Sequence, residues 1–188
     1  MNRNHPSMLS SRSMLSSRSM LKSPSLLKAV WAVTVWCACV IFSGGAALAQ
    51  DAAPEPLSAF PQSLLAIRTT AGKVINFKIW QADSPRREEQ GLMFVRDMDE
   101  HAGMLFVFPG NRQPTMWMKN TYIALDLLFI NEHGRIDHIA AAAKPLSLDL
   151  IQSPKPSIAV LELKGGACDR LGIKVGDTVL HSKLPASR

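Results

Sequence analysis

Short apolar runs, separated by turn-forming residues about every eight to twelve positions, constrain the fold of this chain most strongly. The pattern begins at Leu64 and continues almost to the end of the chain. Within it, residues 73–81 alternate, with Ile75, Phe77 and Ile79 on one face and polar residues on the other. This is the period of a half-buried β-strand. Many short strands with regular turns are typical of a sandwich or barrel, so we predict a mainly β, barrel-like domain.

The predicted domain has about seven strands and two short helices. Ser84 and Pro85 begin the first helix, because serine caps a helix and proline suits its first position. Gly91 is a suitable end for it. We expect the second helix between residues 165 and 172, and a long loop at 144–156, which holds three prolines. The apolar runs that we expect to form strands lie at 64–69, 73–81, 103–108, 115–119, 125–131, 135–143, 157–163 and 178–181.

The beginning of the chain differs from the rest in charge. Five of the 21 basic residues precede Ala49, and none of the 15 acidic residues does. The rest of the chain therefore holds 16 basic against 15 acidic residues, a net charge of +1. This balance gives no support to a basic surface of the kind that binds nucleic acid, so we expect no nucleic-acid partner.

The same region contains an uncharged apolar run of 15 residues at positions 29–43. The basic Lys22 and Lys28 precede this run, and the small residues Ala47 and Ala49 follow it. This order is typical of a cleavable secretory signal peptide, with cleavage expected after Ala49. The run is shorter than the roughly 20 residues that span a bilayer. We therefore predict a periplasmic or secreted protein without a membrane span after cleavage; a retained anchor is the alternative.

These features divide the chain into three parts. Residues 1–49 are the signal peptide with its low-complexity basic start, residues 50–63 a proline-containing linker, and residues 64–184 a single domain. After the signal peptide only Cys168 remains, so we expect no intramolecular disulfide. Because free cysteines are often buried, we expect Cys168 in the core; a reactive or partner-bridging thiol is the alternative.

Several blocks of the sequence resemble a known family. They are Gly91-Leu92-Met93, Gly103–Phe106, Trp117–Thr121 and Leu125-Asp126, followed by Leu161–Leu163, Gly165-Gly166, Leu171–Ile173 and Gly176-Asp177. In this order and spacing they resemble the domain-of-unknown-function family 192 over nearly the whole predicted domain. The resemblance implies a compact, barrel-like, mainly β fold, often behind a signal peptide, and no established activity. Family members tend to carry an arginine three residues before the Gly-Leu-Met block, where this chain has Glu88.

The polar run after strand 115–119 is the first candidate site. The run consists of residues 119–121, and Asp126 follows it in an apolar segment, between two leucines. A carboxylate there is costly to bury unless it is paired or accepts hydrogen bonds. Asp126 either accepts backbone, Asn120 or Thr121 donors and fixes a loop, or forms the polar floor of a cleft. In the second case Lys119 or Arg96 would face an anionic small molecule. The candidate ligand-binding residues are Arg96, Trp117, Met118, Lys119, Asn120, Thr121 and Asp126.

Methionines are concentrated in one part of the predicted domain. The five that follow the signal peptide lie within 26 residues. Thioethers are soft ligands that select Cu(I), so we consider a copper site formed by Met104, Met116 and Met118 with His101. The alternative is that these methionines fill irregular gaps in the core.

Glu162 lies between two leucines, as Asp126 does, which makes these two carboxyls the candidates for acid–base catalysis. No spacing in the sequence forces them together, and the sequence contains no Gly-x-Ser-x-Gly, His-x-x-x-His or Cys-x-x-Cys motif. We therefore expect an exported binding or accessory module, rather than an enzyme, with a small molecule or an exported protein as its partner. A Cu(I) carrier and a hydrolase with paired carboxylates are the alternatives.

Overall fold

The computed structural model describes residues 53–185, so the predicted signal peptide at 1–49 lies outside the described residues. A short 3-10 helix, η1, opens the described part at Leu57–Ala59. The strands are β1 (Gln62–Arg68), β2 (Val74–Ala82), β3 (Ala102–Arg112), β4 (Thr115–Met116), β5 (Leu125–Ile130), β6 (Ile136–Ala143), β7 (Ile151–Gln152), β8 (Ser157–Lys164) and β9 (Thr178–Leu180). The two α-helices are α1 (Pro85–Gln90) and α2 (Ala167–Leu171).

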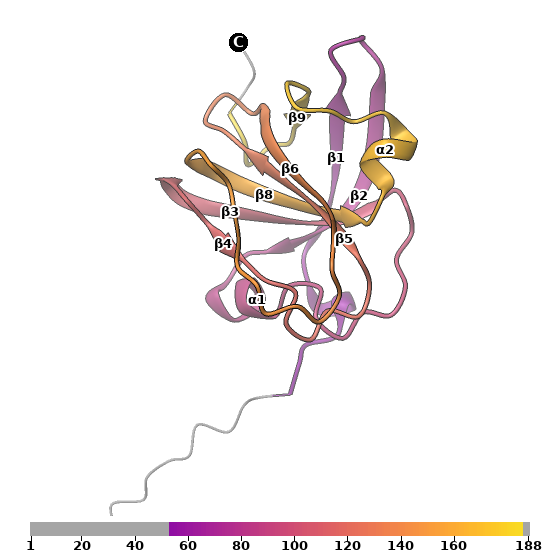
Figure 1. Ribbon diagram of the computed structural model, residues 1–188, viewed down its shortest axis with the longest axis vertical. Coiled ribbons are helices and arrows are strands. Elements are labelled where there is room, and N and C mark those ends of the chain that lie inside the picture. Colours follow the sequence, from indigo (N-terminus) through magenta and orange to yellow (C-terminus); the bar gives the residue numbers. More distant parts are fainter. Residues whose placement is uncertain (1–52, 186–188) are drawn as a thin grey trace, which may run out of the picture. The chain divides into compact units, whose positions relative to one another are not determined.

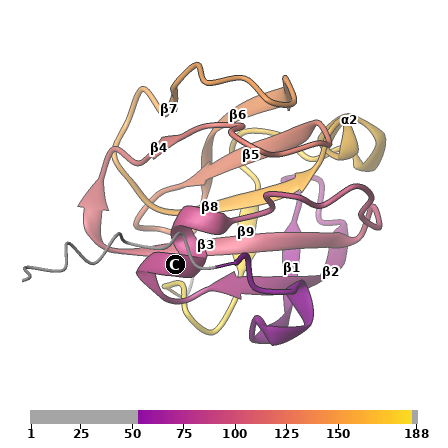
Figure 2. The ribbon, with the colours of Figure 1, turned by 90° about the horizontal axis from the view of Figure 1, so that it is seen from below.

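Seven of these strands form one curled sheet in the order β6-β5-β8-β3-β2-β1-β9, and β4 pairs with β7 in a separate sheet (Figure 1). Strands β2 and β3 run parallel, whereas all other neighbours in the large sheet run antiparallel. Figure 2 shows β4 and β7 on the side of β5 and β6, away from β1 and β2. The prediction of a mainly β fold with two short helices is confirmed.

The two edges of the large sheet meet at one end. Arg135, which directly precedes β6, forms an isolated antiparallel bridge with Thr178, the first residue of β9. Next to this bridge, the backbone N–H of Val179 donates to the carbonyl of Gly134 at 2.8 Å. The sheet therefore curls far enough for its edge strands to share hydrogen bonds, which leaves less unpaired edge exposed.

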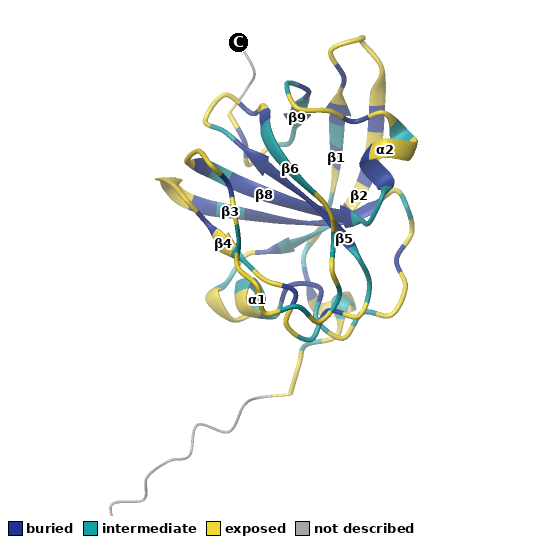
Figure 3. Cartoon of the chain, viewed as in Figure 1, coloured by how far each residue is buried: buried dark blue, intermediate teal, exposed yellow. Residues whose placement is uncertain are grey.

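Apolar side chains pack on both faces of the sheet. One cluster, here called the inner core, draws on all seven strands and includes Phe77, Leu105 and Leu161. A second cluster, the outer core, lies on the opposite face and includes Met104 and Phe106. Strands β5 and β8 contribute to both clusters, because side chains alternate between faces and both faces are covered. Figure 3 shows the resulting band of buried residues along the central strands.

Two local predictions need correction. We predicted a strand that ends at residue 108, but β3 continues through Pro109 and Gly110 to Arg112. The pairing of β3 with β8 shifts register between Val107 and Arg112, so the proline and glycine produce an irregularity within the strand rather than its end. In addition, the predicted loop at 144–156 contains the short strand β7.

The predicted linker at 50–63 is partly attached to the domain. Phe60 is buried in the outer core. The side chain of Glu55 accepts a hydrogen bond from Arg87 Nε at 3.0 Å, and its backbone carbonyl accepts one from Gln90 Nε2 at 2.7 Å. From Glu55 onward the chain therefore packs against α1. Within residues 53–185, no helix has both the length and the apolar character that crossing a membrane requires.

Candidate functional site

A cleft opens on the outer-core side of the sheet, between α1 and β4. It consists of a deep cavity of about 60 Å³ and an adjoining outer trough of about 480 Å³. The two share the lining residues Glu88, Glu89, Phe106, Thr115, Met116 and Trp117. Gly91, Met93, Thr121 and Glu162 line the deep cavity alone, whereas Phe108, Arg112 and Pro114 line the outer trough alone.

Helix α1 brings two adjacent glutamates to this cleft. Ser84 caps the helix, since its hydroxyl accepts a hydrogen bond from the backbone N–H of Arg87 at 3.4 Å, as predicted. Glu88 is half-buried and Glu89 is exposed, and neither forms an ion pair with a described residue. At the position where the family resemblance implies an arginine, this cleft therefore carries the carboxylate of Glu88.

Glu162 forms the end of the deep cavity. It lies in the middle of β8, with Met104 of β3 and Leu127 of β5 as its cross-strand neighbours, and it is only 4% exposed. Its Oε2 atom is buried without a hydrogen-bond partner among the described residues. Burial raises the pKa of Glu162 from 4.5 to about 8, because a carboxylate is poorly solvated there. The carboxyl group is therefore mostly protonated and neutral at pH 7.

Gly91 lines the deep cavity next to the Glu162 carboxyl and, having no side chain, leaves the space there free. It ends α1 with φ of +50°, a backbone conformation that favours glycine. A Cβ atom at this position would lie 3.3 Å from the ring of Phe106 and 3.9 Å from Glu162 Oε2. A side chain here would occupy space beside the unpartnered oxygen, so the glycine of the Gly-Leu-Met block keeps the deep cavity open.

Asp126 does not belong to this site. The register pairs Asp126 of β5 with Leu163 of β8, and Leu127 with Glu162, so the two carboxyls point to opposite faces of the sheet. Asp126 is fully buried, and its oxygens accept backbone N–H donors from Ala142, Gly166 and Cys168 at 2.8–2.9 Å. Asp126 therefore holds the end of β6 at Ala142 and the start of α2, which is the first of its two predicted roles, with backbone donors only.

The candidate copper ligands differ in their exposure. Met104 and Met118 are fully buried in the outer core. His101 is exposed, and its Nδ1 lies 3.2 Å from the carbonyl of Asn76. Of the four predicted ligands, Met116 alone lines the cleft. Within the described part of the chain, no three His, Cys, Asp or Glu side chains are grouped closely enough to hold a metal ion.

The predicted binding run is only partly at the cleft. Trp117 and Thr121 line the deep cavity, but Met118 is a core residue. Lys119 Nζ lies 4.9 Å from the centre of the Trp117 ring, a cation–π contact at the cleft rim. The structure places the remaining predicted binding residues outside the cleft lining: Arg96 over the Tyr122 ring at 4.7 Å, and Asn120 with its Nδ2 3.9 Å from Met93 Sδ.

Sequence reasoning missed most of the cleft lining. Glu88 and Glu89 were not candidates, because a predicted helix does not reveal which strand it packs against. Two sequence signals mark them: their adjacency within a six-residue helix, and the position of Glu88 where the family resemblance implies an arginine. Phe106 and Phe108 were predicted only as residues of a strand. Nothing in the sequence distinguishes apolar residues that line a cavity from those that fill a core.

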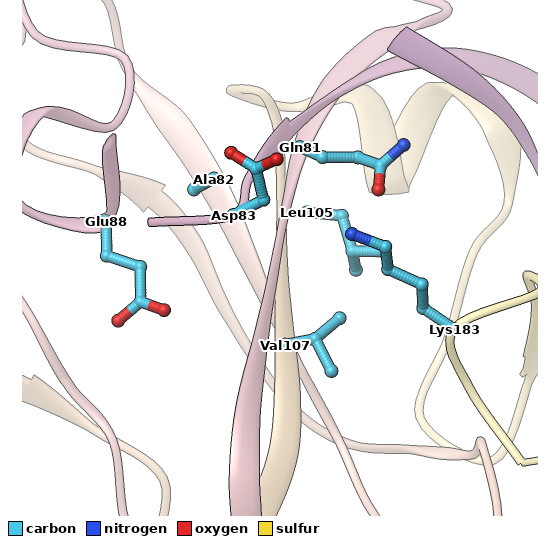
Figure 4. A pocket seen from close by; sticks show the side chains of 7 residues that line it. All are labelled: Gln81, Ala82, Asp83, Glu88, Leu105, Val107 and Lys183. Atoms are coloured by element: carbon cyan, nitrogen blue, oxygen red, sulfur yellow. The ribbon is translucent and has the colours of Figure 1, made fainter. Parts of the chain in front are cut away.

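A second cavity, of about 220 Å³, lies beside β2 and β3 (Figure 4). The side chains of Gln81 and Lys183 lie on one side of it and Glu88 lies on the other. Gln81 Nε2 is 3.1 Å from Ser63 Oγ, which in turn is 2.9 Å from His181 Nε2. The backbone N–H of Lys183 donates to His181 Nδ1, so the proton of neutral His181 is on Nε2 and points at Ser63. His181 therefore cannot act as the base that activates Ser63.

The fold and the cleft define a class: a small, mainly β domain with a surface cleft that ends at a buried, neutral carboxyl. The chain belongs to domain-of-unknown-function family 192, whose description is "Uncharacterized ACR" and whose family model matches residues 66–181. The predicted family is thereby confirmed.

Two solved structures are similar to this chain. One is a proposed transcription regulator from Sinorhizobium meliloti 1021, with 39% identity and a TM-score of 0.65, over 66% of this chain and 97% of that one. The other is a protein of unknown function from Novosphingobium aromaticivorans DSM 12444, with 34% identity and a TM-score of 0.64, over 68% of this chain and 90% of that one. No curated protein matches the chain.

Proposed function

We propose that this chain is an exported, non-enzymatic module that binds a small molecule in the cleft, in contact with Glu162. The observation that carries the proposal is the buried Oε2 atom of Glu162, which has no partner among the described residues and belongs to a side chain that lines the deep cavity. The large majority of buried polar atoms in proteins are hydrogen-bonded, and an exception requires an explanation. A bound ligand that supplies the missing partner provides one.

The free-energy cost of this unpartnered oxygen also supports a role in ligand binding. A buried polar atom without a hydrogen bond costs on the order of 1–3 kcal/mol. Replacing Glu162 with an apolar residue would remove that cost, since its cross-strand neighbours Met104 and Leu127 are apolar and buried. A carboxyl at this position therefore lowers the stability of the empty domain, which is typical of residues that serve binding rather than folding.

Export is the second part of the proposal. It is supported by the acid-free basic start, the apolar run at 29–43 and the small residues Ala47 and Ala49. Expression in a Gram-negative host, followed by N-terminal sequencing of the periplasmic fraction, tests it. Export with cleavage predicts Gln50 as the first residue. A chain that retains residues 29–43 in the cytosol would contradict this part.

The binding part is tested by NMR with a panel of alkylamines, alkanols, carboxylates and monosaccharides. At least one chemical class is expected to shift the backbone amide signals of Gly91 and Thr115, and to lose this effect in Glu162→Gln. Glu132→Gln is the matched control, since Glu132 is an exposed glutamate in the β5–β6 turn. If the whole panel leaves these amides unchanged, or shifts them equally in Glu162→Gln, the proposed site is wrong.

Copper carriage stays as a second candidate because Met93 and Met116 both line the deep cavity beside Glu162. Cu(I) titration in a competing chelator tests it, with Met116→Leu as the cleft variant and Met118→Leu as the core control. Copper binding at the cleft predicts a loss of affinity in the first variant only. The regulator description of the Sinorhizobium relative is not extended to this chain, whose part after residue 49 carries a net charge of only +1.

A further inference from the structure

We infer that the cleft selects a primary ammonium group on an apolar stem, so that its ligand is a small organic amine whose charged end contacts Glu162. This inference rests on the proposed function and adds the chemical class of the ligand. It follows from the charges that line the deep cavity, from the cavity's size and from the apolar walls of the outer trough.

Three glutamates line the deep cavity. Glu88 and Glu89 approach from α1, and Glu162 approaches from β8. No Lys, Arg or His is among the described residues that line this cavity. Besides Glu162, the strands that line it contribute uncharged side chains, such as Phe106 of β3 and Thr115 of β4. Two cations lie outside this lining: Lys119, over the Trp117 ring at the rim, and Arg112, in the outer trough. A cation entering the deep cavity is therefore attracted by Glu88 and Glu89 on one side, and by Glu162 on the other once this carboxyl has lost its proton.

Size restricts the cation. The deep cavity, at about 60 Å³, has the volume of about two water molecules of 30 Å³ each. A primary ammonium fits that space, and its three N–H donors match carboxyl acceptors. A trimethylammonium group has no N–H donor, so it cannot supply the hydrogen bond that Glu162 Oε2 lacks among the described residues. The rest of the ligand would occupy the outer trough, whose lining combines the apolar Phe106, Phe108, Pro114 and Trp117 with the polar Arg112, Gln113 and Thr115. The apolar residues favour a hydrocarbon stem.

Binding an ammonium requires Glu162 to lose its proton to the solvent, so that a charged pair forms in the cavity. The pKa of Glu162 is about 8 in the empty cleft, so the ionised fraction rises about eightfold between pH 7 and pH 8.5. An alkylammonium keeps its charge over this range, as lysine does. Affinity for an amine should therefore rise about eightfold with pH. Affinity for an uncharged analogue, which would bind the protonated carboxyl, should not rise.

The experiment compares four probes that share one stem. Calorimetric titration of the full chain at pH 7 and pH 8.5 would use hexylamine, 1-hexanol, hexanoate and hexyltrimethylammonium. Hexylamine is expected to bind at least tenfold more tightly than the other three and to show the eightfold pH effect. Nα-acetyl-lysine methylamide, which mimics a lysine side chain of a protein partner, is titrated in the same way. Comparing its affinity with that of hexylamine distinguishes a protein ligand from a free amine. Tighter binding of hexylamine supports a small-molecule ligand, and tighter binding of the lysine compound overturns that part of the inference.

Two variants make the test specific. Glu162→Gln should weaken hexylamine binding at least tenfold and abolish its pH dependence. Glu88→Arg places a cation at the half-buried wall of the cavity, and should also abolish hexylamine binding while the thermal unfolding temperature stays within a few degrees. Glu132→Gln should bind as the unmodified chain does.

The outcomes separate the inference from the proposed function. Binding of 1-hexanol or hexanoate that equals hexylamine binding and is lost in Glu162→Gln overturns the ammonium inference and retains the cleft as a binding site. Hexylamine binding that is unchanged in both Glu162→Gln and Glu88→Arg overturns the inference as well. Failure of every chemical class in the wider NMR panel would remove the proposed function itself.

Discussion

Replacing Glu162 with glutamine should change how the stability of the domain depends on pH. In the folded state burial raises the pKa of this carboxyl to about 8, and in the unfolded chain it returns to 4.5. Between these values the unfolded chain releases a proton that the folded domain keeps. The free energy of unfolding therefore falls as pH rises from about 4.5 to about 8, and this loss is absent below the lower value. Glutamine has no proton to release, so the variant lacks this loss.

The size of the effect follows from the two pKa values. Each pKa unit corresponds to about 1.4 kcal/mol. Between pH 5 and pH 7.5 the unmodified domain should lose about 3 kcal/mol relative to Glu162→Gln, on the order of a third of the stability of a typical domain. A change of this size is much larger than the error of an unfolding measurement.

Urea unfolding followed by tryptophan fluorescence, at intervals of half a pH unit, measures this difference. Other ionisable groups also affect stability: the pKa of His181, for example, is lowered by burial and by Lys183, which destabilises the folded state at acid pH. The difference between the two proteins cancels such contributions. Glu89→Gln, an exposed glutamate on the rim, is the matched control and should run parallel to the unmodified domain. If the unfolding free energy of Glu162→Gln varied with pH in parallel with that of the unmodified domain, the conclusion that Glu162 is buried and neutral would be refuted.

Three further outcomes are expected. Gly91→Ala should lower the free energy of unfolding by about 1–3 kcal/mol in urea titrations, because alanine is strained at this φ and its Cβ presses on Phe106; an unchanged midpoint would contradict this. Asp126→Asn should cost about 2–4 kcal/mol and speed hydrogen exchange at the backbone N–H of Cys168, since an amide cannot accept all three donors. Equal exchange rates would argue against that role. The Cys168 thiol, whose pKa burial raises, should react with a disulfide reagent about 100-fold more slowly in the native protein than in urea; equal rates would contradict its burial.

Much of the fold could be predicted from local sequence pattern. The alternation of Ile75, Phe77 and Ile79 identified β2 and its inner face, and all three residues lie in the inner core. Ser84-Pro85 and Gly91 located α1 correctly, because caps and turn residues act locally. The parallel pairing of β2 with β3 was not predictable in this way. It depends on how the segment between them crosses the sheet, which no local pattern encodes.

The candidate site was harder to predict than the fold. The positions of Asp126 and Glu162 within apolar strands correctly marked both as buried carboxyls. Their different roles depend on strand register, which turns one toward the backbone donors around α2 and the other toward the cleft. Similarly, the concentration of methionines reflects both core packing, as for Met104, and cleft lining, as for Met116. Only the three-dimensional arrangement separates these cases.

The most direct test of the account is a carbon-13 NMR titration of the Glu162 side-chain carboxyl, in the empty domain and with saturating hexylamine. A carboxyl at the end of a ligand cleft should titrate with a pKa near 8 when the cleft is empty, and at least one unit lower when the ammonium is bound. A pKa near 4.5 in the empty domain, unchanged by the amine, would contradict both the burial of this group and its role in binding.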